Sequence, residues 1–371
     1  MKELLKKLIE AKSTPDVGEI NCANVLADFF LAANLEQKVD VWDSNRANLI
    51  ARLESTGQKP ALLFVSHLDV VPAEKWGWHF PAFVATEHDG KIFGRGSCDM
   101  KAGIAAAAVA MTEILQSKVR LKGDIIFAAT AGEETDSAGI KRFLESFVKN
   151  KSEICGVIVT EPTNFEIGTA HRGLLWLEIK TKGKTAHGSM PQLGINAIEL
   201  MRAFLNELAH YDITAHPDKL LGSASMSVNK IIGGAATNIV PDMCSAQIDI
   251  RTLPGQNHSR IVKDFEGIFS KLSKQNPDFC AELKILRDVT ALHTDPDCEF
   301  VSQIKQLINK GEVKATSFAT DAPFIAELNI PVVVFGPGNP ELCHKPDEFI
   351  ETENLQKGVD FYKKIILHFL T

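Results

Sequence analysis

Four short and almost wholly apolar segments limit what this chain can fold into. They read ALLFVS (61–66), DIIFAAT (124–130), GVIVT (156–160) and IPVVVFG (330–336). Strands that are apolar along their whole length are buried on both faces, which is typical of a parallel sheet covered by helices. Helical patterns at 103–116 and 136–149 separate the segments, and another helix is expected at 16–33. We therefore predict an α/β fold with a mostly parallel sheet flanked by helices.

The middle of the chain has a different pattern. LLWLEIK (174–180) and SAQIDIR (245–251) alternate between apolar and polar residues, so each strand has one buried face and one wet face. The predicted elements are, in order, strand 174–180, helix 196–209, strand 225–232, strand 245–251, helix 259–273 and strand 281–286. This β-α-β-β-α-β order is the ferredoxin-like arrangement.

The two patterns predict two domains. A chain of 371 residues is also too long for one compact core. We expect residues 174–287 to form an inserted ferredoxin-like α+β domain. Residues 1–173 and 288–371 would then form one discontinuous α/β domain on either side of it.

Charge, hydropathy and cysteine content exclude several classes of protein. The formal net charge is −7 and the basic residues are scattered, so we expect no nucleic-acid or membrane partner. The longest apolar runs, such as AGIAAAAVAM, are too short to span a membrane. The amphipathic N-terminal segment MKELLKKLIEAKSTP lacks the apolar core of a secretory signal. Seven scattered cysteines without a CxxC pair indicate reduced thiols and a cytoplasmic location.

Polar residues follow each of the four apolar segments, and another precedes the helix expected to start near Met100. These residues are His67, Asp69, Asp99, Glu133, Glu134, Glu161 and His344. Ligands of an open parallel sheet bind at the carboxyl ends of its strands, so these side chains are expected to converge. A single His after a strand is more often structural, and a Glu-Glu pair is usually a solvated surface. The whole set, however, holds too many polar groups for a purely structural sheet edge.

The chemistry of this set favours metal ions. Imidazole and carboxylate ligands without cysteine suit Zn²⁺, Co²⁺ or Mn²⁺, and zinc is the first expectation. The carboxylates outnumber what one tetrahedral ion needs, which fits two divalent ions that share a bridging carboxylate. His67 would bind metal through one ring nitrogen, while Asp69 would hold the other N–H.

Several stretches of this sequence together resemble the M20 metallopeptidase family, in particular its acetylornithine deacetylases and succinyl-diaminopimelate desuccinylases. They are SHLDVVP, GRGSCDMKAG, AGEET, TEPT, AHRG, GKTAHGSMPQLGINAIELM, TNIVPD, TDAPFI and GPG followed by HKPDEFIE. They extend from 61 to 351 in the family's order. The resemblance implies a di-metal catalytic domain with an inserted lid or dimerisation domain, and hence a homodimer that forms through the lid.

The resemblance also implies a role for each residue at the strand ends. His67 and Glu161 would bind one ion, and Glu134 and His344 the other. Asp99 would bridge the two ions, and Glu133 would be the general base. Only the resemblance indicates that Glu133 is the base and Glu134 the ligand, because the spacing alone allows either glutamate to be the base.

In the inserted domain, the resemblance points to residues that would contact the substrate. His187 would stabilise the tetrahedral oxyanion from the partner subunit, and Arg251 would bind a carboxylate. Asn238 and Arg172 match further substrate-contacting or junction positions. Taken alone, His187 would be read as a polar loop residue.

These features predict a metal-dependent hydrolase that cleaves the amide bond of a small N-acyl amino acid. Acetylornithine is the first expected substrate and succinyl-diaminopimelate the alternative. The stretch AHRG has His171 where desuccinylases often have Arg, and TDAP (320–323) replaces their TSDG. A di- or aminopeptidase of the same family remains open, as does a non-catalytic homologue. The latter would be expected to lack the base or a ligand, and none is missing here.

Overall fold

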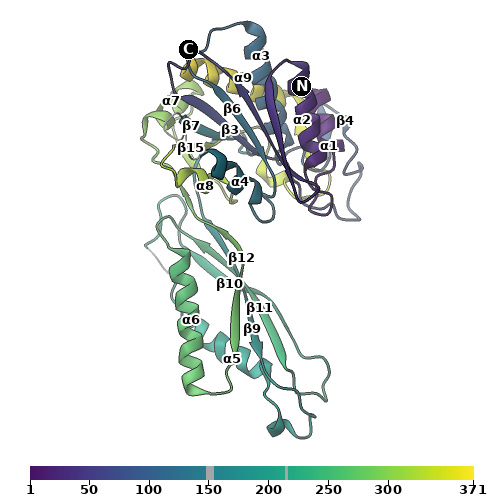
Figure 1. Cartoon of the computed structure of the whole chain (residues 1–371), viewed down its shortest axis with the longest axis vertical. Helices are drawn as coiled ribbons and strands as arrows, with labels where there is room; N and C mark the ends of the chain where they lie inside the picture. Colours follow the sequence, from purple (N-terminus) through teal and green to yellow (C-terminus); the bar gives the residue numbers. More distant parts are fainter. Residues whose placement is uncertain (148–153, 214–215) are drawn as a thin grey trace. The chain divides into compact units, whose positions relative to one another are not determined.

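The computed structural model of the chain describes residues 1–147, 154–213 and 216–371. The chain divides into two compact units (Figure 1). We name the units after the roles that the sequence predicts for them. The catalytic unit comprises Met1–Ala170, His293–Thr316 and Thr320–Thr371, and the lid unit comprises His171–Leu292 and Ser317–Ala319.

The main sheet belongs to the catalytic unit and confirms the predicted α/β fold. Among the described residues its strands are β1 (Glu36–Trp42), β2 (Arg46–Leu53), β3 (Ala61–His67), β6 (Ile125–Thr130), β7 (Ile154–Val159), β8 (Ile167–His171), β13 (Leu292–His293), β14 (Val313–Ala315) and β15 (Val332–Val334). The strand order is β1-β2-β6-β3-β7-β15-β8-β13, and β14 pairs with β8. The four central strands β6, β3, β7 and β15 are parallel. Every residue of β3 and β6 is buried, as continuous apolar strands require.

In the described ranges, the helices of the catalytic unit are α1 (Lys2–Glu10), α2 (Ile20–Ala32), α3 (Lys101–Ser117), α4 (Ala138–Phe147), α7 (Glu299–Leu307), α8 (Ala322–Ala326) and α9 (Thr352–Leu370). Helices α2, α3, α4, α8 and α9 contact the main sheet, whereas α1 packs on α2 and α3, and α7 packs on α9. The helix predicted at 16–33 starts four residues later, because Gly18 forms a turn at φ +83° with no room for a Cβ beside Asn45. The predicted helix at 136–149 starts at Ala138, and its last two residues lie outside the described residues.

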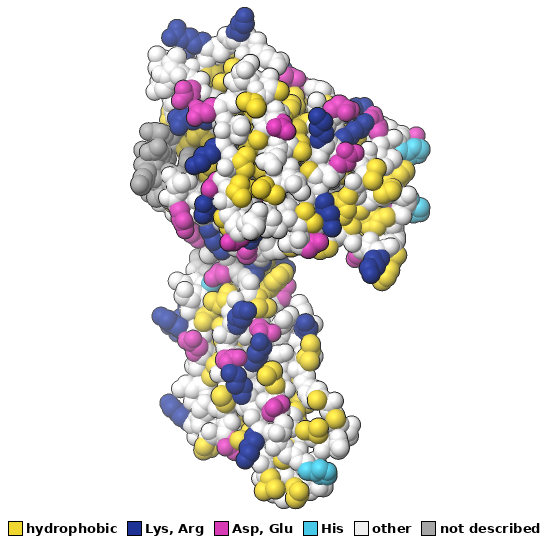
Figure 2. All heavy atoms as spheres, turned by 45° about the vertical axis from the view of Figure 1, so that its right-hand side comes forward, with side chains coloured by type: hydrophobic (Ala, Val, Ile, Leu, Met, Phe, Trp, Pro, Cys, Tyr) yellow, Lys and Arg dark blue, Asp and Glu magenta, His cyan; other side chains and the backbone are white. Residues whose placement is uncertain are grey.

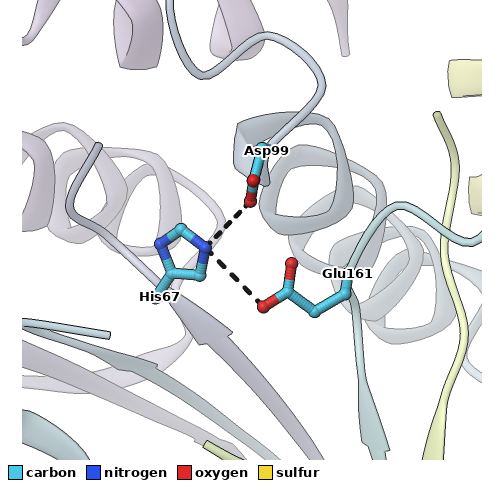
Figure 3. A group of neighbouring side chains, drawn as sticks. All are labelled: His67, Asp99 and Glu161. Carbon is cyan, nitrogen blue, oxygen red and sulfur yellow. Dashed lines mark hydrogen bonds and ion pairs between the residues drawn. The ribbon is translucent and has the colours of Figure 1, made fainter. Parts of the chain in front are cut away.

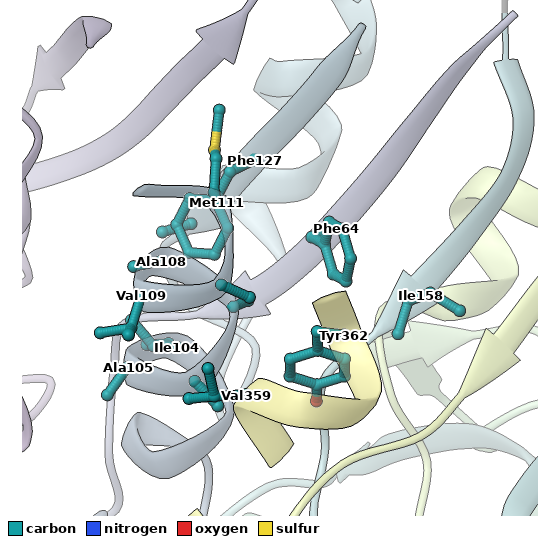
Figure 4. Close-up of a cluster of buried hydrophobic side chains, with 14 of the residues drawn as sticks. Phe64, Ile104, Ala105, Ala108, Val109, Met111, Phe127, Ile158, Val359 and Tyr362 are labelled. Carbon is teal, nitrogen blue, oxygen red and sulfur yellow. The ribbon is translucent and has the colours of Figure 1, made fainter. Parts of the chain in front are cut away.

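Helices α3 and α9 form the core beneath the central strands (Figure 4). The alanine-rich sequence of α3 combines high helix propensity with small side chains, so that α9 can approach closely. Tyr362 of α9 packs edge-on against Phe64 of β3, with 5.4 Å between the ring centroids. Its hydroxyl donates to the carbonyl oxygen of Phe335 at 2.9 Å, so the buried phenol is satisfied.

The lid unit contains an antiparallel sheet whose strands are β9 (Gly173–Lys182), β10 (Ser225–Gly233), β11 (Met243–Thr252) and β12 (Ala281–Val289). Their order, β10-β11-β9-β12, is that of a ferredoxin-like sheet. Helices α5 (Ala197–Leu208) and α6 (His258–Gln275) cover one face (Figure 1). The alternation along β9 and β11 follows from this arrangement, because only one face of the sheet is buried.

A small sheet, β16-β5-β4, joins β16 (Phe349–Glu351), β5 (Lys91–Phe93) and β4 (Thr86–His88). No helix in the described ranges has both the length and the apolar character that a membrane span needs. On the face drawn in Figure 2, basic and acidic side chains are interspersed rather than gathered into one charged area.

Candidate metal centre

The structure brings all seven predicted strand-end residues together at one edge of the main sheet. His67 is the last residue of β3, Asp99 lies just before α3, and Glu161 follows β7. Glu133 and Glu134 follow β6, and His344 lies beyond β15. Three groups have ligand atoms within 4.8 Å of one another: His67, Asp99 and Glu161; His67, Glu133 and Glu134; and Asp99, Glu134 and His344. The side chains at the ends of the parallel strands thus lie close together, as predicted.

In the first group, drawn in Figure 3, His67 and Glu161 are buried and Asp99 is partly buried. Nε2 of His67 lies 3.1 Å from Oδ1 of Asp99 and 3.7 Å from Oε1 of Glu161. Burial lowers the pKa of His67, but the facing carboxylates of Glu161 and Asp99 outweigh it and raise the pKa well above its ordinary value. One ring nitrogen therefore faces two carboxylates in a dry environment.

The third group, of Asp99, Glu134 and His344, is more open to solvent. Nε2 of His344 lies 2.8 Å from Oε1 of Glu134 and 3.3 Å from Oδ2 of Asp99, and its side chain is 51% exposed. Hydrogen bonds to Asp99 and Glu134 raise the pKa of His344 to about 10. Asp99 therefore directs one oxygen to His67 and the other to His344, so its carboxylate lies between the two groups.

The charges in this cluster fit metal cations. Burial raises the pKa of Glu161 well above its ordinary value and also raises that of Glu134, and the neighbouring Asp99 carboxylate adds to both shifts. A cation between these oxygens would remove both penalties. Imidazole nitrogen and carboxylate oxygen are also the donors that Zn²⁺ and related divalent ions bind.

Asp69 organises this edge of the sheet in a way that differs in detail from the prediction. Nδ1 of His67 lies 2.9 Å from the main-chain carbonyl oxygen of Asp69 and 3.7 Å from its carboxylate. The carbonyl can only accept, so Nδ1 carries the proton and Nε2 faces the other ligands. The ring N–H is therefore held by the backbone of Asp69 and not by its side chain.

The carboxylate of Asp69 instead holds the turn that carries the two glutamates. It accepts the main-chain N–H groups of Gly132, Glu133 and Glu134 at 2.8, 3.0 and 2.9 Å. Gly132 has φ +80°, and a Cβ there would lie 2.1 Å from the guanidinium of Arg46. The turn thus needs both the buried carboxylate of Asp69 and a glycine at position 132.

The predicted residues of the lid unit are engaged within that unit. Nδ1 of His187 lies 2.7 Å from the hydroxyl of Ser189, and His187 is exposed. The carbonyl of Asn238 accepts the N–H of Gly188 at 2.7 Å, so the segments of His187 and Asn238 pair. The substrate roles of His187 and Asn238 stay predictions.

Both predicted arginines of the lid unit also have local partners. Arg251 forms two hydrogen bonds, of 2.9 and 3.1 Å, with the carboxylate of Asp249 on the same strand. Arg172 donates to the carbonyl of Leu221 at 2.6 and 3.1 Å. A guanidinium bound to a carboxylate already has the geometry that it would use with a substrate carboxylate.

Two residues of this region received no role from the sequence. Arg95 and Glu348 are 2% and 1% exposed and form an ion pair of 2.7 Å directly beneath Asp99. Both lie within stretches that carried the family resemblance, GRGSCDMKAG and HKPDEFIE. The available signal in the sequence was a charged residue four positions from a ligand candidate, as Glu348 is from His344. The pairing of Arg95 with a residue so distant in the chain could not be predicted.

Comparison with known proteins identifies the family of this chain. The family Peptidase family M20/M25/M40 matches residues 63–368. The chain is 30% identical to a probable succinyl-diaminopimelate desuccinylase of Staphylococcus epidermidis, over 99% of this chain and 97% of the relative. It is 31% identical to an acetylornithine deacetylase of Pectobacterium carotovorum, with the same coverage of each chain.

The fold also matches solved structures. A metallo-carboxypeptidase of the M20 family from Sulfolobus solfataricus, Sso-CP2, superposes with a TM-score of 0.81 at 17% sequence identity. The match covers 98% of each chain. Such low identity supports the fold only, whereas the family match spans the metal-ligand candidates from His67 to His344. The chain belongs to peptidase family M20/M25/M40 and is a hydrolase.

Proposed function

We propose that this protein is a di-metal hydrolase that cleaves the amide bond of an N-acyl amino acid and releases a carboxylate and a free amine. Acetylornithine is the first candidate substrate, and succinyl-diaminopimelate is the alternative; both would place the enzyme in amino-acid biosynthesis. The observation that carries the proposal is the position of Asp99 between two groups of ligand atoms. The names of relatives that are about 30% identical support the substrate class.

The geometry supports a division of the ligands between two ions. His67 and Glu161 would hold one ion, and Glu134 and His344 the other. Asp99 would bridge them, because its two oxygens face different histidines at 3.1 and 3.3 Å. The donor set suits zinc, with cobalt or manganese as alternatives.

Glu133 is the proposed general base. Two bound ions would supply Lewis-acid activation of a water molecule and of the acyl carbonyl. Glu133 would accept the proton of that water and deliver it to the leaving amine. Its burial, its ligand-like distance from His67 and Glu134, and the fixed turn beneath it support this role.

The lid unit would provide contacts to the substrate. His187 would donate to the developing oxyanion, and Arg251 would bind the α-carboxylate, with Asn238 and Arg172 as further contacts. We further propose that the lid unit forms the homodimer. Strand β10 lies at the edge of its sheet and exposes Val228, Ile231 and Ile232.

The cellular setting is also a proposal. The seven cysteines of the chain are free thiols, among them Cys98 beside the metal centre. This state supports a cytoplasmic location, where thiols stay reduced.

A direct test combines metal analysis with substrate competition. The purified protein should bind two divalent ions and hydrolyse N-acetylornithine with a higher kcat/KM than N-succinyl-diaminopimelate or dipeptides. The Glu133→Gln variant serves as a control for contaminating hydrolases. Fewer than one bound ion, together with no activity after addition of Zn²⁺ or Co²⁺, would overturn the proposal. A preference for the succinyl substrate would replace acetylornithine with the alternative.

A further inference from the structure

A buried carboxylate lies directly beneath the loop that carries Asp99. Glu348 is 1% exposed, and its Oε1 accepts the main-chain N–H groups of Cys98 and Asp99 at 2.9 and 3.0 Å. Its Oε2 accepts from Nη1 of Arg95 at 2.7 Å. Both oxygens therefore bind groups of the same loop, which runs from Arg95 to Asp99. Main-chain N–H groups held by a fixed carboxylate set the orientation of their peptide planes.

The pair of Arg95 and Glu348 also contacts the loop that carries His344. Glu348 follows His344 by four residues, and the guanidinium of Arg95 donates to the carbonyl of Lys345 at 3.3 Å. The guanidinium also lies over the ring of Trp78, 5.1 Å from the ring centroid. Strands β5 and β16, which adjoin the two loops, pair with each other. The pair thus fastens the Asp99 loop to the His344 loop.

Stability alone does not account for this pair. Burying a carboxylate and a guanidinium costs a large desolvation energy, and apolar residues of similar size often stabilise a core as well or better. Both charges are nonetheless almost completely buried, in contact with the loop of a proposed bridging ligand. We propose that Glu348, held by Arg95, is a positioning residue that orients Asp99 so that both of its oxygens can bind metal.

Glu348 is not itself placed as a ligand. Its two oxygens are occupied by N–H donors, and it belongs to none of the ligand groups found among the described residues. Asp69 offers an internal parallel, because its carboxylate holds the Glu133–Glu134 turn through three main-chain N–H groups. Two buried carboxylates thus fix the two acidic loops of the site.

The inference rests on the proposed function, since it assumes that Asp99 bridges two ions. It makes a distinctive prediction for that reason. Loss of a terminal ligand such as His344 should weaken one site, whereas misplacement of the bridge should weaken both together. Changes in outer groups that orient ligands typically reduce metal affinity about 10- to 100-fold.

The test measures the affinity of both Zn²⁺ sites by competition with chelators of graded strength, and the d–d absorption spectrum of the Co²⁺ protein. We expect Glu348→Ala to weaken both sites about 10- to 100-fold and to alter the spectrum. Glu348→Gln should be affected less, because the amide oxygen can still accept from Cys98 and Asp99. This partial rescue keeps the test decisive if the alanine variant does not fold.

Asp347→Ala is a matched control from the neighbouring position. Asp347 also accepts two main-chain N–H groups, from His79 at 2.8 Å and Phe80 at 3.2 Å, but none from the Asp99 loop. Its variant should keep both affinities within about twofold, and the melting temperatures of the chelated proteins show how much general stability each variant loses.

The outcomes separate this inference from the proposed function. Wild-type affinities in both Glu348 variants would overturn the positioning role, and so would weakening of a single site. Equal losses in Asp347→Ala and Glu348→Ala would also overturn it, because they would indicate a general effect on the loop. If the wild-type protein binds fewer than two ions, the proposed function itself fails, whatever the variants show.

Discussion

The candidate residues of the two units differ in how they are held. Those of the catalytic unit are mostly buried and face one another, as His67 and Asp99 do at 3.1 Å. In the lid unit, His187 is exposed and bonded to Ser189, while Arg251 is bonded to Asp249 on its own strand. One set is already assembled around a common point, whereas His187 and Arg251 are each bonded to a residue two positions away in the chain.

Substitutions in the two units should therefore have two different kinds of effect. A metal site needs fixed ligands, so its residues are fastened by a buried network that excludes other partners. A residue that contacts a substrate only during turnover must exchange one partner for another. Substitutions in the catalytic unit should therefore alter metal binding or the chemical step, and those in the lid unit should alter catalysis while the metal stays bound.

The largest expected effect is that of Glu133→Gln. The amide cannot accept the proton, so kcat should fall about 10²- to 10⁴-fold while both ions stay bound. Glu134→Gln is the matched variant, because it makes the same change one residue later but should weaken metal binding. Activity assays with metal analysis would check both. If Glu133→Gln loses metal and Glu134→Gln does not, the two roles are reversed.

His187→Ala should have the next largest effect. If His187 donates to the oxyanion, its loss should lower kcat about 10²- to 10³-fold with unchanged metal content. His210→Ala, which removes another exposed histidine of the lid unit, provides the control and should retain wild-type kcat. Loss of metal in His187→Ala would break the distinction between the two units.

Much of this architecture followed from local patterns in the sequence. The apolar runs of β3 and β6 predicted buried strands because both faces of those strands are covered. The alternation in β9 and β11 predicted a sheet with one covered face. Strand ends then located the ligand candidates, since parallel strands bring their carboxyl ends to one edge.

Other features depend on residues far apart in the chain and could not be predicted in this way. The ion pair of Arg95 and Glu348 joins residues 253 positions apart. The side chain of Asp69 binds a turn more than 60 residues away, while its backbone carbonyl takes the N–H of His67. Strands β1 and β2 were also missed, because their mixed polar and apolar residues form no continuous run. Contacts between residues so far apart form only in the folded chain, so local sequence patterns do not predict them.

Arg251→Ala should have a smaller effect than the changes to His187 and Glu133. Loss of a charged hydrogen bond to the substrate carboxylate should reduce kcat/KM roughly 10- to 100-fold, mainly through KM, without loss of metal. Arg202→Ala is a matched control in the same unit, because Arg202 also pairs with a nearby carboxylate, that of Glu199, at 2.7 Å. If both variants behave alike, Arg251 has no special role with the substrate.

The smallest expected effect concerns His171, which lies where the chain passes from the catalytic unit to the lid unit. Burial lowers the pKa of His171 to about 4, although the carbonyl of Arg172 opposes the shift. Well above pH 6.5 the ring is neutral in both the folded and the unfolded chain. As the pH falls through 6.5 towards 4, mainly the unfolded chain gains a proton, so the free energy of unfolding falls by at most about 1.4 kcal/mol per pH unit.

His171→Gln should remove this source of acid sensitivity. The free energy of unfolding in urea, measured on chelated protein at pH 7.5, 6.5, 5.5 and 4.5, would show it. The variant can be less stable than the wild type at pH 7.5, but the gap should narrow by about 1 kcal/mol between pH 6.5 and 5.5. His88→Gln, a change on the surface of the catalytic unit, controls for the removal of a histidine in general. If the difference in unfolding free energy between the two proteins stays constant with pH, the burial of His171 does not contribute to acid unfolding. His171 would then behave like the exposed residues of the lid unit and not like the buried residues of the candidate metal centre.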